Sequence, residues 1–306
     1  MTAPSRDHLT REQDALLRAE LLRIAAANHP LSVRALYYQA VLNPALPFLT
    51  KDADGSRRSE RLVAGRCLEL RRSGAMPWEW ITDPSRASYE VERFGGLAPF
   101  AAMAPWYYRR DLWADQGQRP IVMVEKAAAI STVLQHCNEA GVDVWATKGY
   151  GSATQLKDIA LAAHPLLERG QDVVALVLAD FDPSGWGWPQ SAEAEIRSHL
   201  DRLGPVAAEI HFERLLMTEE QAAGIGHQVA LRAANPKDRR TKAFLERFSL
   251  ADDSEVCVEL DALAPVEVRS LLTDRFEDLF DGDLTDEQDQ QQADRERIRQ
   301  ALVALS

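Results

Sequence analysis

The sequence predicts an α/β protein in which a mainly parallel sheet has helices on both faces. Two observations support this fold class: apolar, often β-branched runs alternate with amphipathic segments, and acidic clusters follow two of those runs. Strands that are joined by helical crossovers lie parallel in one sheet. We expect strands at residues 121–125, 142–146, 173–179 and 206–211, and helices between and after them at residues 127–140, 152–163 and 189–203.

Before this sheet, the sequence predicts three helices and a short ribbon. The first helix covers residues 11–28, with leucines on one side and charges opposite, and the second begins after Ser32 and ends at Asn43. The third covers residues 59–73, and residues 76–86 then alternate and turn as a small β-wing would. This order is typical of a winged helix-turn-helix, with residues 59–73 as the recognition helix.

The chain of 306 residues is long enough for two domains, and its character changes near residue 118. Residues 97–116 are expected to be helical and rich in aromatic side chains, and a short polar linker follows them. We therefore divide the chain into an N-terminal helical domain, residues 1–118, and a sheet-containing domain, residues 119–306. From Asp274 onward the sequence is acidic and polar, which predicts a solvated helical segment.

The charge distribution is compatible with double-stranded DNA as a partner, although the formal net charge is −12. Residues 1–118 contain 16 lysines and arginines against 14 acids, whereas the remainder contains 19 against 33. Because DNA affinity comes largely from basic side chains on phosphates, the arginines of the predicted recognition helix are the expected contacts, Arg66 and Arg71 among them. Lys237 lies in a basic loop that is either a DNA-backbone contact or a plain solvated turn.

The sequence is expected to belong to a cytoplasmic, nucleoid-associated protein. No stretch has the uninterrupted apolar length of a membrane span, and the N-terminal residues lack the apolar core of a signal peptide. The three cysteines are isolated, which predicts a reducing compartment and no structural zinc. None of the seven histidines has a partner at a spacing typical of metal ligands.

Carboxylates follow two of the predicted strands at the point where each strand ends. Glu125 follows the first apolar run, and Asp180 and Asp182 follow the run at residues 173–179. Since the carboxyl ends of parallel strands meet at one edge of a sheet, we expect these three acids to lie together. They would repel one another unless a cation shared them, and hard oxygen ligands suit Mg²⁺. The sequence therefore predicts a Mg²⁺ site for phosphodiester chemistry.

A second group of reactive residues lies on the second predicted helix. Tyr38 follows Arg34 by four residues, so the two side chains share a helix face at roughly 5–6 Å between Cβ atoms. A phenol with a pKa near ~10 is a poor nucleophile, and a neighbouring arginine helps by holding the phosphate and stabilising the transition state. Alternatively, Tyr37 and Tyr38 are two core aromatics. Tyr107 and Tyr108 lack an arginine four residues before them, so packing is favoured there.

The acidic clusters, in this order and with the loop Lys148-Gly-Tyr-Gly-Ser152 between them, resemble the Toprim domain of topoisomerases, primases and some nucleases. Arg34-x-x-Tyr37-Tyr38 on a winged-helix element before such a domain resembles the A subunit of type IIB topoisomerases (topoisomerase VI) and the meiotic transesterase that starts recombination. The likeness is closest to the short bacterial, archaeal and phage relatives called mini-A, and it covers roughly residues 30–275. The other matching segments are Arg72-x-Gly74-x-x-Pro77, Ile81-x-Asp83-x-x-Arg86, Val124–Lys126, Thr147–Gly149, Ala179–Gly185 and Val258–Leu263.

This resemblance implies a catalytic arrangement and a set of partners. Tyr38 would be the nucleophile that forms a 5′-phosphotyrosyl link, with Arg34 as its transition-state partner. The implied Mg²⁺ ligands are Glu125, Asp180 and Asp182, and the implied phosphate contacts are Lys126 and Lys148. The family acts as a homodimer in which the tyrosine of one chain faces the metal site of the other. A separate ATPase subunit is a possible further partner, although nothing in this chain resembles one.

Three functions of different classes are therefore compared. The first is a tyrosine transesterase that breaks double-stranded DNA, and the second is a Toprim metallonuclease that uses metal-activated water while Tyr38 is silent. The third is a DNA-binding protein without catalysis, which the three acids disfavour because clustered carboxylates near phosphate are costly without a metal. Glu259 and Asp261, at the end of a further predicted strand at residues 256–261, are either a second metal feature or structural caps.

Overall fold

The computed structural model describes most of the chain. The described residues are 9–51, 57–82, 91–147, 153–225, 232–233, 238–248 and 255–303. Two of the expected DNA contacts, Lys148 and Lys237, lie outside them, as does the second half of the expected wing.

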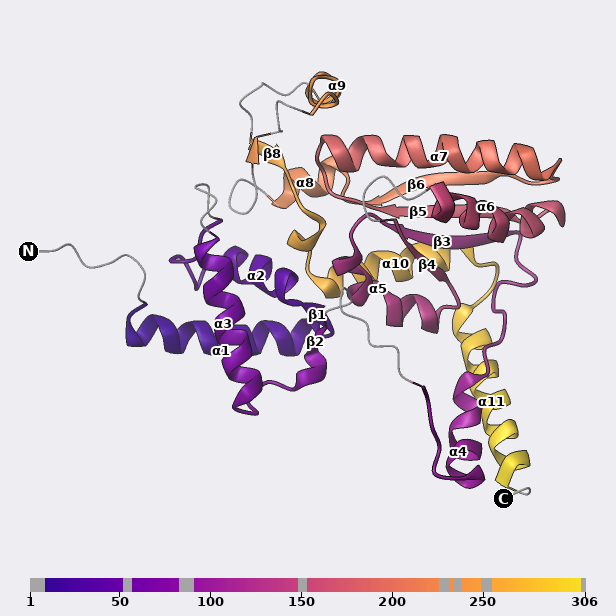
Figure 1. Cartoon of the computed structure of the whole chain (residues 1–306), viewed down its shortest axis with the longest axis horizontal. Helices are drawn as coiled ribbons and strands as arrows, with labels where there is room; N and C mark the ends of the chain where they lie inside the picture. The colour runs from indigo at the N-terminus through magenta and orange to yellow at the C-terminus, as the bar shows by residue number, and fades with distance from the viewer. Residues whose placement is uncertain are drawn as a thin grey trace, which may run out of the picture.

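A four-stranded, all-parallel sheet forms the centre of the described structure (Figure 1). Its strands lie in the order β4-β3-β5-β6, with bounds β3 (Gln118–Val124), β4 (Asp143–Ala146), β5 (Asp172–Leu178) and β6 (Ile210–Leu216). The helices that flank it are α5 (Ala127–Glu139), α6 (Ala153–Glu168), α7 (Pro183–Leu203) and α10 (Pro265–Leu279). The expected α/β class, with a parallel sheet between helices, is confirmed.

The two faces of the sheet belong to two separate buried clusters. On β5, Val173, Ala175 and Val177 pack with residues of α6 and α7. Val174, Leu176 and Leu178 point to the opposite face, where residues of α5 and α10 cover them. A strand alternates its side chains in this way, and a run that is apolar at every position is buried on both faces.

Several element boundaries differ from expectation: β3 begins at Gln118, α6 continues to Glu168, the helix expected at residues 97–116 ends at Tyr107, and both β6 and α7 are displaced. Strand β6 covers Ile210–Leu216 and not residues 206–211; its later part was missed because, as an edge strand, it accommodates the charged residues Glu213 and Arg214. Helix α7 begins at Pro183, six residues earlier than expected. Its glycines and Pro189 resemble a loop in the sequence, but Asp182 caps the helix by accepting a hydrogen bond from Gly185 N.

The three N-terminal helices match the expectation within one residue at each compared end. They are α1 (Arg11–Asn28), α2 (Val33–Leu42) and α3 (Arg58–Arg72). Thr10 forms a capping box with Gln13 at the start of α1, and Ser32 accepts from Ala35 N at the start of α2. These local signals are present in the sequence, which explains why the helix positions are predictable.

The segment expected to form a wing is only partly described. A 3₁₀ turn at Trp78–Trp80 leads into β2 (Ile81–Thr82), which pairs in parallel with β1 (Leu31–Ser32) before α2. Trp80 stacks on His29 with ring centroids 5.0 Å apart. In the described part, this strand therefore closes the start of α2 and does not form a hairpin of its own.

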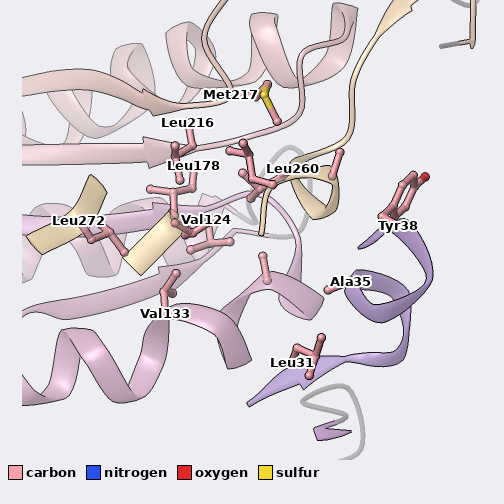
Figure 2. Close-up of a cluster of buried hydrophobic side chains, with 14 of the residues drawn as sticks. Leu31, Ala35, Tyr38, Val124, Val133, Leu178, Leu216, Met217, Leu260 and Leu272 are labelled. Atoms are coloured by element: carbon pink, nitrogen blue, oxygen red, sulfur yellow. The ribbon is translucent and has the colours of Figure 1, made fainter. Parts of the chain in front are cut away.

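Residues on both sides of position 118 share one hydrophobic core. A continuous buried cluster contains Leu36 and Tyr38 of α2 together with Leu178 of β5 and Leu260 (Figure 2). Leu260 begins a 3₁₀ turn, Leu260–Ala262, that lies against α2. The helical part and the sheet are thus packed directly against each other, and the packing brings α2 to the carboxyl end of the strands.

The C-terminal segment is helical but is not a solvated tail. Apolar residues that recur every three or four positions bury one side of α10, including Phe276 and Leu279. Helix α11 (Leu284–Val303) then packs against α4 (Leu97–Tyr107), and the pair extends away from the sheet (Figure 1). The high acid content of this segment obscured its sparse but regularly spaced apolar positions.

Short elements complete the described chain. They are α8 (Glu219–Ile225), β7 (Arg232–Ala233), α9 (Thr241–Arg247) and β8 (Glu255–Cys257). β7 and β8 are antiparallel, and the strand expected at residues 256–261 is shortened to β8 and the 3₁₀ turn. Among the described residues, no helix combines the length and apolarity that a membrane crossing requires.

Candidate functional site

Five buried acids meet at the carboxyl end of the sheet. Glu125 follows β3, Asp180 and Asp182 follow β5, and Glu259 and Asp261 lie just after β8. The last two are brought there by an antiparallel bridge in which Phe181 and Val258 exchange both main-chain hydrogen bonds, at 2.8 and 2.9 Å. Sequence reasoning correctly predicted that the strand ends would bring Glu125 and Asp180 together: Glu125 Oε2 accepts from Asp180 N at 3.3 Å.

Lys126 is the cation that lies among these acids. Its ammonium group forms an ion pair with Asp180 Oδ2 and lies 3.2 Å from Glu259 Oε2. Asp180 Oδ1 accepts a further hydrogen bond from Leu260 N at 2.9 Å. Burial lowers the pKa of Lys126, but the carboxylates of Asp180 and Glu259 more than offset this, so its pKa is raised. The chain itself therefore supplies one positive charge where the sequence predicts a metal ion.

The three expected metal ligands have the right chemistry for Mg²⁺ but are not converged on one point. Within the described residues, no three acid, histidine or cysteine side chains have an arrangement that could hold a metal ion. Asp180 is paired with Lys126, and Asp182 Oδ1 accepts from Gly185 N at 2.7 Å as the cap of α7. Coordination by all three carboxylates therefore requires Asp180 to release Lys126.

Glu125 shows that negative charge at this position is not fully compensated. Burial, together with the charges of Asp180 and Asp182, raises the pKa of Glu125 from 4.5 to about 7. A divalent cation beside it would favour the ionised carboxylate by the same electrostatic argument. The oxygen donors of Glu125, Asp180 and Asp182 thus suit a hard cation in their chemistry, although the three side chains do not converge on one point in the described structure.

Arg34 is held on the other side of the acidic group. Its guanidinium forms an ion pair with Glu259 through Nη2, and its Nε lies 3.1 Å from Asp261 Oδ2. Burial raises the pKa of Glu259, but Lys126 and Arg34 outweigh it and lower that pKa to about 2. For Asp261 burial dominates, and its pKa rises to about 6. Glu259 therefore stays ionised as the link between Lys126 and Arg34.

Tyr38 lies beside Arg34, as the helical spacing predicts. Its hydroxyl is 3.5 Å from Arg34 Nη2, and the guanidinium carbon is 5.5 Å from the centre of the tyrosine ring. Tyr38 is nevertheless buried, at the edge of the hydrophobic cluster in Figure 2. Burial and the nearby Glu259 carboxylate raise the pKa of its phenol above the ordinary value. In this chain the tyrosine is thus close to the acids of its own subunit.

The two arginines expected to contact DNA are committed to partners within the chain. Arg66 forms an ion pair with Asp14 of α1 and another, at 3.1 Å, with Glu69. Arg71 lies over the Trp78 ring, 4.1 Å from its centroid, and donates to Trp78 O at 3.3 Å. Both side chains therefore help to hold α3 in position.

The exposed face of α3 presents a different pair of arginines. Arg61 and Arg72 are both exposed and lie eleven residues apart, close to three helical turns, so they share a face. Leu68 is on the same face and is also exposed, at 38%. A groove-binding helix would present this face outward, whereas Arg66 points toward α1.

Sequence reasoning missed one charged residue of the site. Arg214 lies in the edge strand β6 and donates hydrogen bonds to main-chain oxygens of the turn that contains Asp180 and Asp182. No motif marks it in the sequence. It lies beyond the strand expected at residues 206–211, so the sequence offered no signal for it.

The comparisons with other proteins do not assign this site. No family model, no curated protein and no solved structure matches the chain. The functional interpretation therefore depends on the residues and geometry described above and on the motifs of the sequence.

Gly185 provides a test of how closely the acidic turn is packed. A Cβ atom there would lie 2.3 Å from Asp180 O and 2.9 Å from Glu125 Oε2, so the Gly185→Ala variant must displace main-chain atoms. We expect urea unfolding to show a loss of about 1–3 kcal/mol, as for other overpacked sites. The matched control is Gly224→Ala in α8, where the added methyl meets nothing within 4 Å and should be neutral or stabilising. Equal effects of the two substitutions would contradict the close packing.

The raised pKa of Glu125 predicts a pH-dependent stability in the absence of divalent cations. Its folded pKa, about 7, exceeds the ordinary 4.5, so the folded state binds the proton more tightly. The contribution of Glu125 to the free energy of unfolding should therefore be greatest below pH 4.5. This contribution should fall as the pH rises to 7, by on the order of 2 kcal/mol.

Urea unfolding in chelator at several pH values between 5 and 8 measures this effect. The Glu125→Gln variant should lose most of the decline, and a smaller slope should persist because the pKa of Asp261 is raised to about 6. The prediction fails if wild type and variant show the same dependence on pH.

Proposed function

We propose that this chain is a Mg²⁺-dependent DNA-cleaving enzyme in which Tyr38 attacks a phosphodiester. One observation supports this proposal most strongly. A continuous series of polar contacts runs from the Tyr38 hydroxyl through Arg34, Glu259 and Lys126 to Asp180. A residue that is only a core aromatic has no need of a guanidinium at its hydroxyl and a cluster of acids behind it.

The fold supports a finer architectural proposal of the same kind. Three helices precede a parallel sheet with acids at its carboxyl edge, which agrees with a winged helix-turn-helix followed by a Toprim domain. On this interpretation α3 is the recognition helix, and the sheet holds the metal ligands. The proposed partners are double-stranded DNA, a second copy of the chain and a separate ATPase subunit.

In the proposed reaction Tyr38 Oη forms a bond to phosphorus while the bond from phosphorus to O3′ breaks. The product is a 5′-phosphotyrosyl link, and the departing O3′ takes up a proton to become a hydroxyl. The phenol proton has the Glu259 carboxylate as a hydrogen-bond acceptor beside it. Arg34 would hold a non-bridging phosphate oxygen once DNA competes for its guanidinium. A bound Mg²⁺ would supply electrostatic stabilisation of the phosphate charge.

A second candidate function is hydrolysis of DNA with metal-activated water as nucleophile. One specific observation favours it: Tyr38 is buried, and burial and Glu259 raise the pKa of its phenol. Deprotonation of such a tyrosine is harder than deprotonation of an exposed one. The two candidates share the ligands Glu125, Asp180 and Asp182, and they differ only in whether protein becomes attached to DNA.

The decisive measurement is a search for protein attached covalently to DNA ends. After incubation with double-stranded DNA and Mg²⁺ and denaturation, wild type should be attached to 5′ ends. Tyr38→Phe removes only the hydroxyl, so strand breakage and attachment should both fall below detection. Asp180→Asn removes a charged ligand of the same shape and should also abolish cleavage.

A neighbouring tyrosine provides the matched control for this experiment. Tyr37 packs edge-to-face on Tyr38, with ring centroids 5.1 Å apart, and Tyr37→Phe should retain cleavage. Cleavage by Tyr38→Phe without attached protein would establish the hydrolytic candidate instead. Full activity of wild type in excess chelator would rule out both.

The exposed face of α3 yields a separate prediction about DNA binding. Replacing Arg61 and Arg72 with alanine should flatten the salt dependence of binding by about 0.9 in the log–log slope for each lost phosphate contact. Arg66→Ala should instead lower stability, because it breaks the pair with Asp14, and should leave the slope unchanged. The reverse pattern, measured by DNA titration at several salt concentrations, would move the contact face to the side of α3 that contains Arg66.

A further inference from the structure

Arg214 lies where β6 changes the direction of its side chains. Up to this point β6 pairs in register with β5, with Val177 opposite Arg214, but Leu178 then pairs with Leu216. Leu215 is therefore an extra residue, a β-bulge. Ile210 belongs to the cluster beneath α6 and α7, whereas Leu216 belongs to the cluster on the other face. Bulges of this kind often redirect a side chain beside a functional site.

The guanidinium of Arg214 binds both ends of the acidic turn. Its Nη2 donates to Asp180 O at 2.6 Å and to Ala179 O at 3.4 Å, and its Nη1 donates to Gly185 O at 2.9 Å. Its Nε donates to Met217 O at 2.7 Å, which ties the turn to the end of β6. One planar group thus fixes the segment that contains Asp180 and Asp182 without using an oxygen of either carboxylate.

The sequence explains why Gly185 O needs this donor. In a helix, the carbonyl of Gly185 would accept from the main-chain N–H of residue 189, but residue 189 is proline and has no N–H. Arg214 supplies the missing donor. A partly buried carbonyl without a partner is costly, so the proline and the arginine form a matched pair.

Arg214 also places a permanent positive charge beneath the acids. Its guanidinium interacts electrostatically with Glu125, Asp180 and Asp182, and its carbon lies 4.9 Å from the centre of the Trp186 ring. The four hydrogen bonds all go to main-chain oxygens, unlike the ion pair of Lys126, which occupies Asp180 Oδ2. The charge of Arg214 therefore compensates the cluster without itself occupying a carboxylate oxygen.

We propose that Arg214 is the positioning residue of the carboxylate cluster: it fixes the main chain of the turn from which Asp180 and Asp182 would reach a divalent cation once Asp180 releases Lys126. This inference rests on the proposed metal-dependent function. It assigns to Arg214 an effect on metal affinity that a merely structural arginine would not have. Lysine in its place would keep the charge but could not bind both ends of the turn with a rigid fork.

The test is direct binding of Mn²⁺, used as a probe for Mg²⁺ and followed by the electron paramagnetic resonance signal of the free ion. Wild type, Arg214→Lys and Arg214→Gln are compared, with circular dichroism as the check of folding. We expect Arg214→Lys to weaken Mn²⁺ binding by about ten-fold or more, as loss of outer-shell partners does in other metal sites. Arg214→Gln, which also loses the charge, should weaken it further.

Arg197 supplies the matched control. It lies on α7, donates to Ile210 O at 2.8 Å and lies 5.8 Å from the centre of the Phe212 ring, so it makes similar contacts on the same face of the sheet. Arg197→Lys should leave Mn²⁺ affinity unchanged. Equal Mn²⁺ affinity of folded Arg214→Lys, Arg197→Lys and wild type would overturn the inference.

Pro189→Ala tests the same inference without depending on the stability of the first variant. It gives Gly185 O a helical N–H partner, so the double variant Arg214→Lys with Pro189→Ala should fold and recover part of the Mn²⁺ affinity. If the single variant Arg214→Lys folds, a folded double variant that binds Mn²⁺ no better than the single variant counts against Arg214 as a positioning residue. If the single variant does not fold, a folded double variant that binds Mn²⁺ as tightly as wild type counts against it. Failure of wild type to bind Mn²⁺ at all would instead reject the proposed metal site.

Discussion

The ion pair between Lys126 and Asp180 is the interaction on which the rest of the acidic edge depends. Five buried carboxylates lie close together at the carboxyl edge of the parallel sheet, and no such group is stable without compensating positive charge. Lys126 follows Glu125 directly, so the end of β3 places both a carboxylate and a positively charged side chain at this edge of the sheet. The Glu259 carboxylate contacts both Lys126 and Arg34. Because Arg34 lies on α2, this contact joins the helical part of the chain to the sheet.

Two of the cations beside the cluster, Lys126 and Arg214, have different roles. Lys126 contacts carboxylate oxygens and so competes with any metal ion for Asp180. Arg214 contacts main-chain oxygens and competes for none. The difference follows from the chemistry of the two groups, because an ammonium is a compact point charge and a guanidinium is a planar fork. In the described structure the chain's own cations therefore compensate the acids, Lys126 through side-chain oxygens and Arg214 through main-chain oxygens.

The sequence allowed much of this fold to be predicted, and the exceptions have physical causes. Helices α1 and α2 have local caps, and α3 has regularly spaced buried residues along one side, so their positions needed no tertiary information. The start of α7 was missed because its glycines and proline look like a loop, and Arg214 compensates for that proline. The meeting of Glu125 and Asp180 was predictable from strand polarity alone. The pairing of Arg34 with Glu259 was not, because it depends on how a distant segment docks.

The separation in sequence between these partners has a consequence for how the protein is made. Arg34 and Glu259 are 225 positions apart, and the bridge between Phe181 and Val258 holds the later segment in place. A chain that emerges from the ribosome cannot complete the charged cluster until the residues around Glu259 have been synthesised, although α1 to α3 can form much earlier. Incomplete chains therefore contain Arg34, Tyr38 and the strand-end acids without the Glu259 carboxylate that joins Arg34 to Lys126.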